Sequence, residues 1–176
     1  EKVFLDKTDS TKNCYTILYP PKLPWKGYIL LLPGFGETAD RVLQQTDLPK
    51  KLALKGILTI IPTLQDGVLS LGVDSLSQQS LNRILNDVTS NHRLADQRFY
   101  IGGYSIGGSC AIKYAENSVV KPTAVFAIDP PLDFERFYNS AKRDIRLSKN
   151  NEASQESIYM IDRLETETGG SPTTNL

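Results

Sequence analysis

The sequence predicts an α/β fold built on a mostly parallel sheet with helices on both faces. Two continuous apolar runs, Tyr28 to Leu32 and Ile57 to Ile61, are typical of strands that are buried on both sides. Segments with apolar residues at helical spacing alternate with these runs. A short apolar strand at Phe99 to Ile101 leads into a glycine-rich turn and a further helical segment. This alternation favours parallel strands joined by crossover helices.

Length and composition indicate one globular domain. The chain has 176 residues, of which 40% are hydrophobic and 23% charged, and its formal net charge is zero. Because the sequence has no basic stripe, nucleic acid is not an expected partner. No stretch reaches the roughly 18 apolar residues of a membrane span, so no span is expected.

Cysteine and histidine usage excludes some classes of site. Cys14 and Cys110 lie far apart and are expected to be buried free thiols, with a single disulfide as the alternative. A lone histidine excludes a His-rich metal site, and no metal or other cofactor is expected. The sequence starts at Glu1 and not at Met. A cleaved signal peptide or a trimmed sequence would both produce this start, and we favour a secreted or periplasmic location.

The other elements follow from the same patterns. In chain order, the sequence predicts strands at 2–5 and 14–19 and helical pieces within 40–54 that are broken near Pro49. The strand at 57–61 is expected to stop at Pro62, and a loop should follow over 63–72. Further along, we expect a helix capped by Asp74, a strand at 119–128 and a helix over 134–146 capped by Asp133. Thr46 or Asp47 can cap the second helical piece. Residues 154–168 fit either a strand at 158–161 or a helix stopped by two glycines, and we favour the helix.

The turn after the strand at Phe99 to Ile101 carries the pattern G-x-S-x-G, as Gly103-Tyr104-Ser105-Ile106-Gly107. A serine on a sharp strand-to-helix turn has a strained backbone, and small residues two positions away let the strand and the helix pass closely. Such a turn lifts the hydroxyl clear of the sheet and directs the helix N-terminus at a bound group. We interpret Ser105 as a nucleophile, with an ordinary glycine-rich turn as the alternative.

A second glycine-rich loop, Pro33-Gly34-Phe35-Gly36-Glu37-Thr38, directly follows the buried strand at Tyr28 to Leu32. Proteins of the α/β class place ligand sites at the C-terminal ends of such strands. The alternative is a plain turn.

The segments LLPGFGE at 31–37 and GYSIGG at 103–108, with the order of the elements, resemble the α/β-hydrolase superfamily. The resemblance covers the first six strands of that family, ending at Asp129. It implies a three-layer α/β-hydrolase fold in which residues 1–176 form a single incomplete domain that lacks the C-terminal strands. Residues 133–170 would form a helical cap or lid segment.

The resemblance also implies an oxyanion hole. The family loop is usually His-Gly-x, and Pro33 stands here in place of the histidine. The backbone N–H groups of Phe35 and Ile106 would be the two donors. They would bind the negative oxygen that develops when Ser105 attacks an acyl carbon.

The sequence departs from the family in its catalytic base and acid. The family order is serine, acid and then histidine, but the one histidine, His92, precedes Ser105. At about 3.3 Å per strand residue the two lie roughly 20 Å apart, whereas a base must lie within about 3 Å. We therefore expect His92 at a helix end, and the catalytic histidine and the acid outside the given chain. Asp129 and Asp162 are acid candidates, expected respectively in a structural turn and on an exposed helix face.

The sequence is thus interpreted as part of a serine hydrolase that acts on carboxylic esters through an acyl-enzyme on Ser105. Truncation explains the missing strands better than loss of catalysis in a complete protein, because the sheet would otherwise keep an uncovered edge. The 176-residue piece alone is expected to be inactive.

Other functions stay open. The expected partner is a small-molecule ester or peptide, and the oligomeric state is open. A serine peptidase of the same fold and an inactive hydrolase-like binding domain remain alternatives. A nucleotide-binding domain is disfavoured because neither a P-loop nor a G-x-G-x-x-G in the first strand–helix unit is present.

Overall fold

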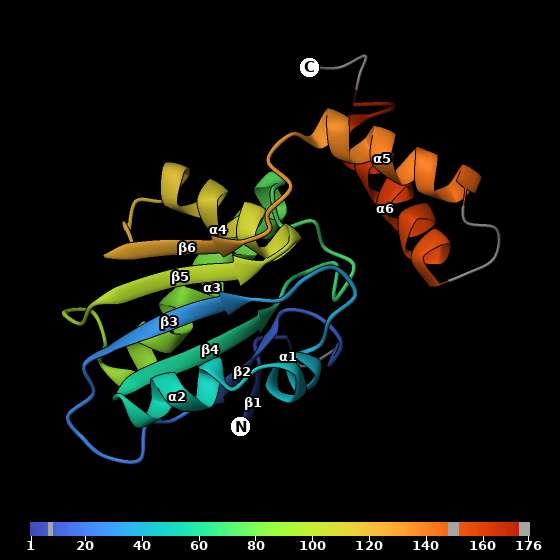
Figure 1. Ribbon diagram of the computed structural model, residues 1–176. Helices are drawn as coiled ribbons and strands as arrows, with labels where there is room; N and C mark the ends of the chain where they lie inside the picture. Colours follow the sequence, from blue (N-terminus) through green and yellow to red (C-terminus); the bar gives the residue numbers. More distant parts are fainter. Residues whose placement is uncertain (7–8, 148–151, 173–176) are drawn as a thin grey trace. The chain divides into compact units, whose positions relative to one another are not determined.

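A six-stranded sheet is the centre of the structure, a computed structural model that describes residues 1–6, 9–147 and 152–172. The strands are β1 Lys2–Phe4, β2 Cys14–Leu18, β3 Gly27–Leu32, β4 Ile57–Thr63, β5 Phe99–Tyr104 and β6 Ala124–Ile128. Their order in the sheet is β1-β2-β4-β3-β5-β6 (Figure 1). β1 pairs antiparallel with β2, and β2 with β4, whereas β4, β3, β5 and β6 pair parallel. The predicted, mostly parallel sheet is confirmed.

Helices cover both faces of this sheet (Figure 1). The helices between its described strands are α1 Ala39–Gln45, α2 Leu48–Leu54, α3 Ser75–His92 and α4 Ile106–Asn117. Tyr28, Leu30 and Leu32 of β3 pack with buried residues of α3 and α4, whereas Leu31 packs with Val42 of α1. Successive side chains of a strand point to opposite faces, so this apolar run is buried on both sides.

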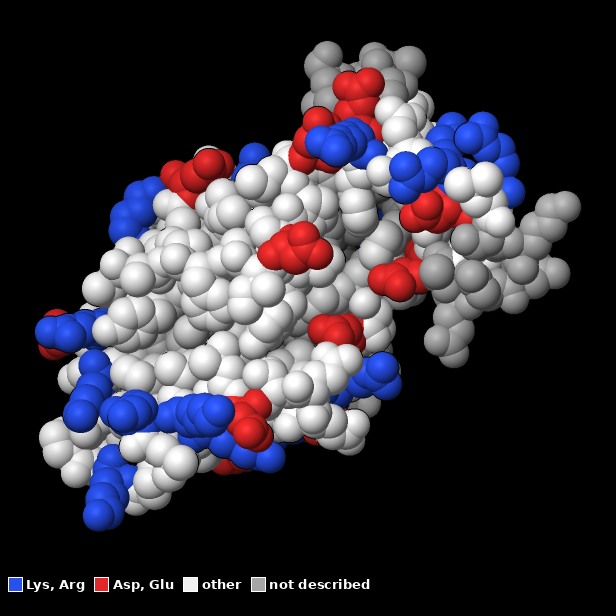
Figure 2. Space-filling model, viewed as in Figure 1, with Lys and Arg blue, Asp and Glu red and all other residues white. Residues whose placement is uncertain are grey.

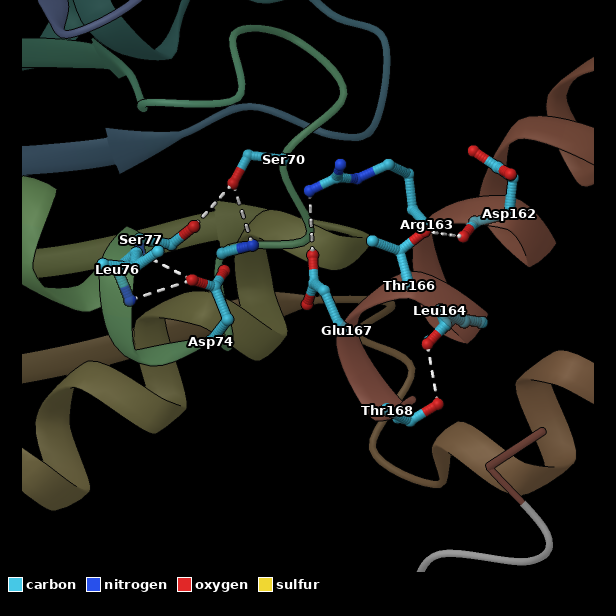
Figure 3. Close-up of polar contacts among 11 residues, drawn as sticks. Ser70, Asp74, Leu76, Ser77, Asp162, Arg163, Leu164, Thr166, Glu167 and Thr168 are labelled. Carbon is cyan, nitrogen blue, oxygen red and sulfur yellow. Dashed lines mark hydrogen bonds and ion pairs between the residues drawn. The ribbon is translucent and has the colours of Figure 1, made fainter. Parts of the chain in front are cut away.

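The long helix α3 begins where the sequence predicts. Oδ1 of Asp74 accepts hydrogen bonds from the N–H groups of Leu76 and Ser77 at 2.9 and 2.8 Å (Figure 3). These bonds satisfy two of the four donors that a helix start leaves unpaired. The hydroxyl of Tyr114 in α4 donates to Oδ1 of Asn82 in α3 at 2.9 Å and ties the two helices together.

In two strands the difference from the prediction lies near a proline. β4 continues through Pro62 to Thr63. β3 pairs with β4 only as far as Ile60, whereas β2 pairs with β4 as far as Thr63. At Pro62, β4 therefore needs no N–H to donate to β3. β6 begins at Ala124 and not at Val119, and Pro122, which lies between them, has no N–H to donate to a ladder.

The edge of the sheet at β6 is apolar and exposed. Among the described strands, β6 pairs with β5 only. Val125 and Ile128 remain 41% and 50% exposed. Figure 2 shows a broad area with few charged side chains in the middle of the face that is seen in Figure 1. In the described sheet β6 is therefore an edge strand with partly exposed apolar side chains.

The chain divides into two compact units, Glu1–Pro130 and Pro131–Leu176, and the sheet belongs to the first. The second unit contains α5 Phe134–Leu147 and α6 Glu152–Thr168, joined by a segment of which residues 148–151 lie outside the description. The hydroxyl of Tyr138 in α5 donates to the carboxylate of Glu165 in α6. A cap role for residues 133–170 stays a prediction.

The start of α5 in the second unit follows the predicted cap. Oδ1 of Asp133 accepts from the N–H of Arg136 at 2.8 Å at the start of α5. In α6 the hydroxyls of Thr166 and Thr168 donate to backbone carbonyls one turn earlier, each at 2.7 Å (Figure 3). The helix favoured for residues 154–168 is confirmed, and the strand alternative is excluded.

Two glycines allow β5, α4 and the end of β3 to approach one another closely. A Cβ on Gly103 would lie 2.4 Å from the carbonyl carbon of Gly107. A Cβ on Gly107 would lie 2.3 Å from the carbonyl oxygen of Pro33. Real Cβ atoms do not come this close to backbone atoms, so both positions require glycine.

We expect Gly103→Ala and Gly107→Ala each to lower the free energy of unfolding by about 3 kcal/mol, the upper part of the usual overpacking range. Gly34→Ala is the matched control, because its Cβ would meet only the movable side chain of Glu37, at 3.1 Å. Urea unfolding followed by circular dichroism measures all three variants. Equal stability of the three would contradict the close approach.

Two buried tyrosines, Tyr15 and Tyr114, should make the free energy of unfolding fall at alkaline pH. Burial raises the pKa of Tyr114 to about 12 from an ordinary value of 10.0. Burial and the hydrogen bond to Asp87 also raise the pKa of Tyr15. The folded chain therefore holds these protons more tightly than the unfolded chain does. The resulting stability is complete below about pH 10 and is lost as the pH rises toward 12 and beyond.

Urea unfolding at pH 8, 10 and 11 should show this fall in the free energy of unfolding. Tyr114→Phe should start lower, because it loses the bond to Asn82, and should then fall less steeply with pH. A variant whose pH dependence runs parallel to that of the natural protein would count against the prediction.

Candidate active site

Ser105 occupies the turn between β5 and α4 with a strained backbone. Its φ is 48° and its ψ is −126°, a combination that residues other than glycine rarely adopt. The Ser105 N–H donates to the carbonyl of Ile128 at 2.8 Å, and the Ser105 carbonyl accepts from the N–H of Gly108 at 2.8 Å. The hydroxyl makes no capping bond to α4, and the residue is half-buried. The strand–turn–helix setting that the G-x-S-x-G motif requires is thus present.

The loop after β3 is tied to the rest of the chain by three of its four backbone N–H groups from Gly34 to Glu37. Gly34 donates to the Glu37 carboxylate at 3.0 Å. Gly36 donates to the carbonyl of Val68 at 2.8 Å, and Glu37 donates to the carbonyl of Gly34 at 3.2 Å. Within the described chain, the fourth N–H, that of Phe35, has no acceptor. The donor that the resemblance singles out is therefore the one that the loop leaves unused.

The second predicted donor lies at the start of α4. The N–H of Ile106 belongs to the first turn of the helix, where no carbonyl of the same helix can accept it. No other acceptor for it is found among residues 1–6, 9–147 and 152–172. The partial positive charge of a helix N-terminus also favours an anion at this place.

A small cavity of about 30 Å³ is lined by both segments. Gly34 and Glu37 of the loop line it, together with Ile106 and Gly107 of α4. Its volume leaves room for a water molecule. The Phe35 side chain is itself buried and 8% exposed. The fold thus brings together the two segments that carry the predicted donors, because Gly107 allows α4 to contact the end of β3.

Cys110 also lines this cavity but is not a competing nucleophile. It is 2% exposed, and like Cys14 it is a free thiol, as predicted. Burial raises the pKa of the Cys110 thiol, and the charge of Asp74 raises it further. The thiol therefore stays protonated at neutral pH, whereas the reactive form of cysteine is the thiolate.

His92 is the last residue of α3 and packs into an aromatic cluster. Its ring centroid lies 5.6 Å from that of Tyr19 and 5.9 Å from that of Trp25. The whole length of β5 separates this end of α3 from the turn that holds Ser105. The expectation of a histidine at a helix end is confirmed, and His92 is not placed to act as a base for Ser105.

The two acid candidates lie in different settings. Tyr104 and Ile128 are paired across β5 and β6, so Asp129 follows β6 beside the point where Ser105 follows β5. Asp129 has a φ of 53° and is exposed, as suits a turn residue. Asp162 lies on the exposed face of α6, as expected.

Sequence reasoning missed the hydrogen bond from Gly34 to Glu37. A carboxylate three residues after a loop glycine is the only signal for it, and such spacing is common in turns without this bond.

Among the described residues, no group of His, Cys, Asp and Glu side chains could hold a metal ion. No described helix is long and apolar enough to cross a membrane.

Comparison by sequence finds no matching family model and no matching curated protein. Comparison by structure finds enzymes. FphF of Staphylococcus aureus, a fluorophosphonate-binding serine hydrolase, matches 97% of this chain with a TM-score of 0.62 and 14% identity. A carboxyl esterase from Bacillus coagulans matches 89% (TM-score 0.55, 18% identity), and a monoglyceride lipase from Saccharomyces cerevisiae matches 86% (TM-score 0.56, 13% identity).

The chain spans only part of each of these structures, namely 75% of FphF, 51% of the esterase and 65% of the lipase. These three structural neighbours are a serine hydrolase, an esterase and a lipase, and the likeness at these identities is one of fold. With its mostly parallel sheet, its helices on both faces and its serine turn after β5, this chain has the fold of the α/β-hydrolase superfamily, in part.

Proposed function

We propose that this chain carries the nucleophile and the oxyanion hole of a serine hydrolase that acts on carboxylic esters. One observation carries the proposal: the strained Ser105 turn lies in a fold that also leaves the N–H groups of Phe35 and Ile106 without acceptors in the described chain. Backbone donors without partners next to a nucleophile are what stabilisation of an oxyanion needs.

In the proposed reaction, the Oγ of Ser105 forms a bond to the acyl carbon of the ester. The carbonyl electron pair moves to oxygen, and the N–H groups of Phe35 and Ile106 donate to the resulting anion. Collapse expels the alcohol, which takes up the serine proton through a general base and leaves an acyl-enzyme. Water then attacks the acyl-enzyme and releases the acid. Loss of one such donor typically costs about 10²–10³ in turnover.

The general base, and with it the acid, would come from residues outside the given sequence. Supporting this, the only histidine of the chain is packed against Tyr19 and Trp25 at the far end of α3. The chain also spans 51–75% of the three enzymes it resembles. Residues 133–170 would supply a helical cap, as part of the same hydrolase.

An inactive hydrolase-like binding domain is the second candidate, and the position of His92 is the observation that favours it. A serine peptidase is also consistent with the serine turn, because attack on an acyl carbon does not specify the leaving group. The names of the structural neighbours, an esterase and a lipase among them, favour the ester.

A fluorophosphonate probe should react with Ser105 in the full-length protein. Attack by Oγ on phosphorus forms the P–O bond and expels fluoride with the serine proton. Ser105→Ala should not react, whereas Ser90→Ala, a change at an exposed serine of α3, should react like the natural protein. Mass spectrometry of the tryptic peptide locates the adduct. A folded full-length protein that does not react would favour the inactive binding domain.

A matched pair of substrates separates esterase from peptidase. The same acyl group is offered as a p-nitrophenyl ester and as a p-nitroanilide, and release of the chromophore is followed. We expect hydrolysis of the ester, no detectable hydrolysis of the anilide, and no hydrolysis of either by Ser105→Ala. Because an activated ester is the easier substrate for either class of enzyme, the anilide decides: its hydrolysis, lost in Ser105→Ala, would identify a peptidase instead.

A further inference from the structure

Glu37 holds the loop after β3 through two hydrogen bonds to the same glycine. Its carboxylate Oε2 accepts from the Gly34 N–H at 3.0 Å, and its own N–H donates to the Gly34 carbonyl at 3.2 Å. The residue lies before α1, whose N-cap is Thr38, so the helix does not require its side chain. A carboxylate acceptor makes a stronger hydrogen bond than a neutral one does.

The loop needs such a restraint because glycines occupy two of its four positions from Gly34 to Glu37. Gly36 has a φ of 73°, and no other atom lies within 4 Å of where its Cβ would be. Glycine gives a loop the widest range of backbone conformations. With Gly34 held by Glu37 and Gly36 held by Val68, the peptide between them keeps one orientation, and that peptide carries the N–H of Phe35.

The charge of Glu37 cannot itself favour an oxyanion. Glu37 is the one charged residue among those that line the small cavity next to Ile106 and Gly107. A negative charge there opposes a second negative charge on the substrate oxygen. Any increase in reaction rate due to Glu37 must therefore come from its hydrogen bond to Gly34. The negative charge of Glu37 acts in the opposite direction.

We propose that Glu37 is a positioning residue for the reaction of Ser105: its bond to Gly34 orients the Phe35 N–H as an oxyanion donor. This role rests on the proposed hydrolase function. Two properties of the Glu37 side chain can be tested separately, namely its hydrogen-bond acceptor and its charge. Glu37→Gln keeps an oxygen that can accept from Gly34 and removes the charge, whereas Glu37→Ala removes both.

The test is the second-order rate constant for reaction of a fluorophosphonate with Ser105 in the full-length protein. The phosphoryl oxygen of the probe takes the place of the oxyanion. We expect Glu37→Ala to react about 10-fold more slowly, a smaller loss than that known for a whole donor. Glu37→Gln should react at least as fast as the natural protein. Glu116→Ala, at an exposed position of α4, is the matched control and should not differ.

The outcomes separate this role from the function on which it rests. If the natural protein reacts and Glu37→Ala reacts equally fast, or if Glu37→Gln is as slow as Glu37→Ala, the role of Glu37 is overturned and the hydrolase remains. If the natural protein does not react at Ser105, the proposed function fails and the role fails with it.

Amide hydrogen exchange by NMR provides a readout that does not depend on activity. The Gly34 amide should be protected in the natural protein and in Glu37→Gln, and should lose protection in Glu37→Ala. The Phe35 amide should exchange fast in all three. Equal exchange of Gly34 in the three proteins would overturn the proposal, and the thermal midpoints show whether each variant is folded.

Discussion

The close contact between backbones around Gly103 and Gly107 is the constraint on which the rest of the site depends. Gly103 lies against the carbonyl group of Gly107, and Gly107 lies against the carbonyl oxygens of Leu32 and Pro33. The start of α4 is therefore held against both β5 and the end of β3. Ser105, between the two glycines, must turn sharply and takes a positive φ. The strain is held in place by bonds to Ile128 and Gly108.

The same contact places the loop after β3 next to the N-terminus of α4. In that loop every N–H from Gly34 to Glu37 is used within the chain except that of Phe35, and the N–H of Ile106 is unused as well in the described residues. Unpaired backbone donors are uncommon in buried regions. Both donors belong to segments that line one cavity, and the proposed oxyanion hole rests on this pair of donors.

The strands and the serine turn could be predicted because local sequence decides them. The apolar run of β3 is buried on both faces, and Asp74 and Asp133 cap helices as expected. The errors arise where strand pairing decides: Pro62 fits in β4 because the pairing with β3 ends at Ile60, and β6 starts late after Pro122. The bond of Glu37 to Gly34 could not be predicted, because it depends on the path of a glycine-rich loop.

A crystal structure of the full-length protein with a fluorophosphonate bonded to Ser105 tests the central claim most directly. The account predicts that the phosphoryl oxygen lies about 2.7–3.1 Å from the backbone nitrogens of both Phe35 and Ile106. An adduct whose phosphoryl oxygen faces solvent, or binds other donors while these two nitrogens stay unpaired, would contradict it.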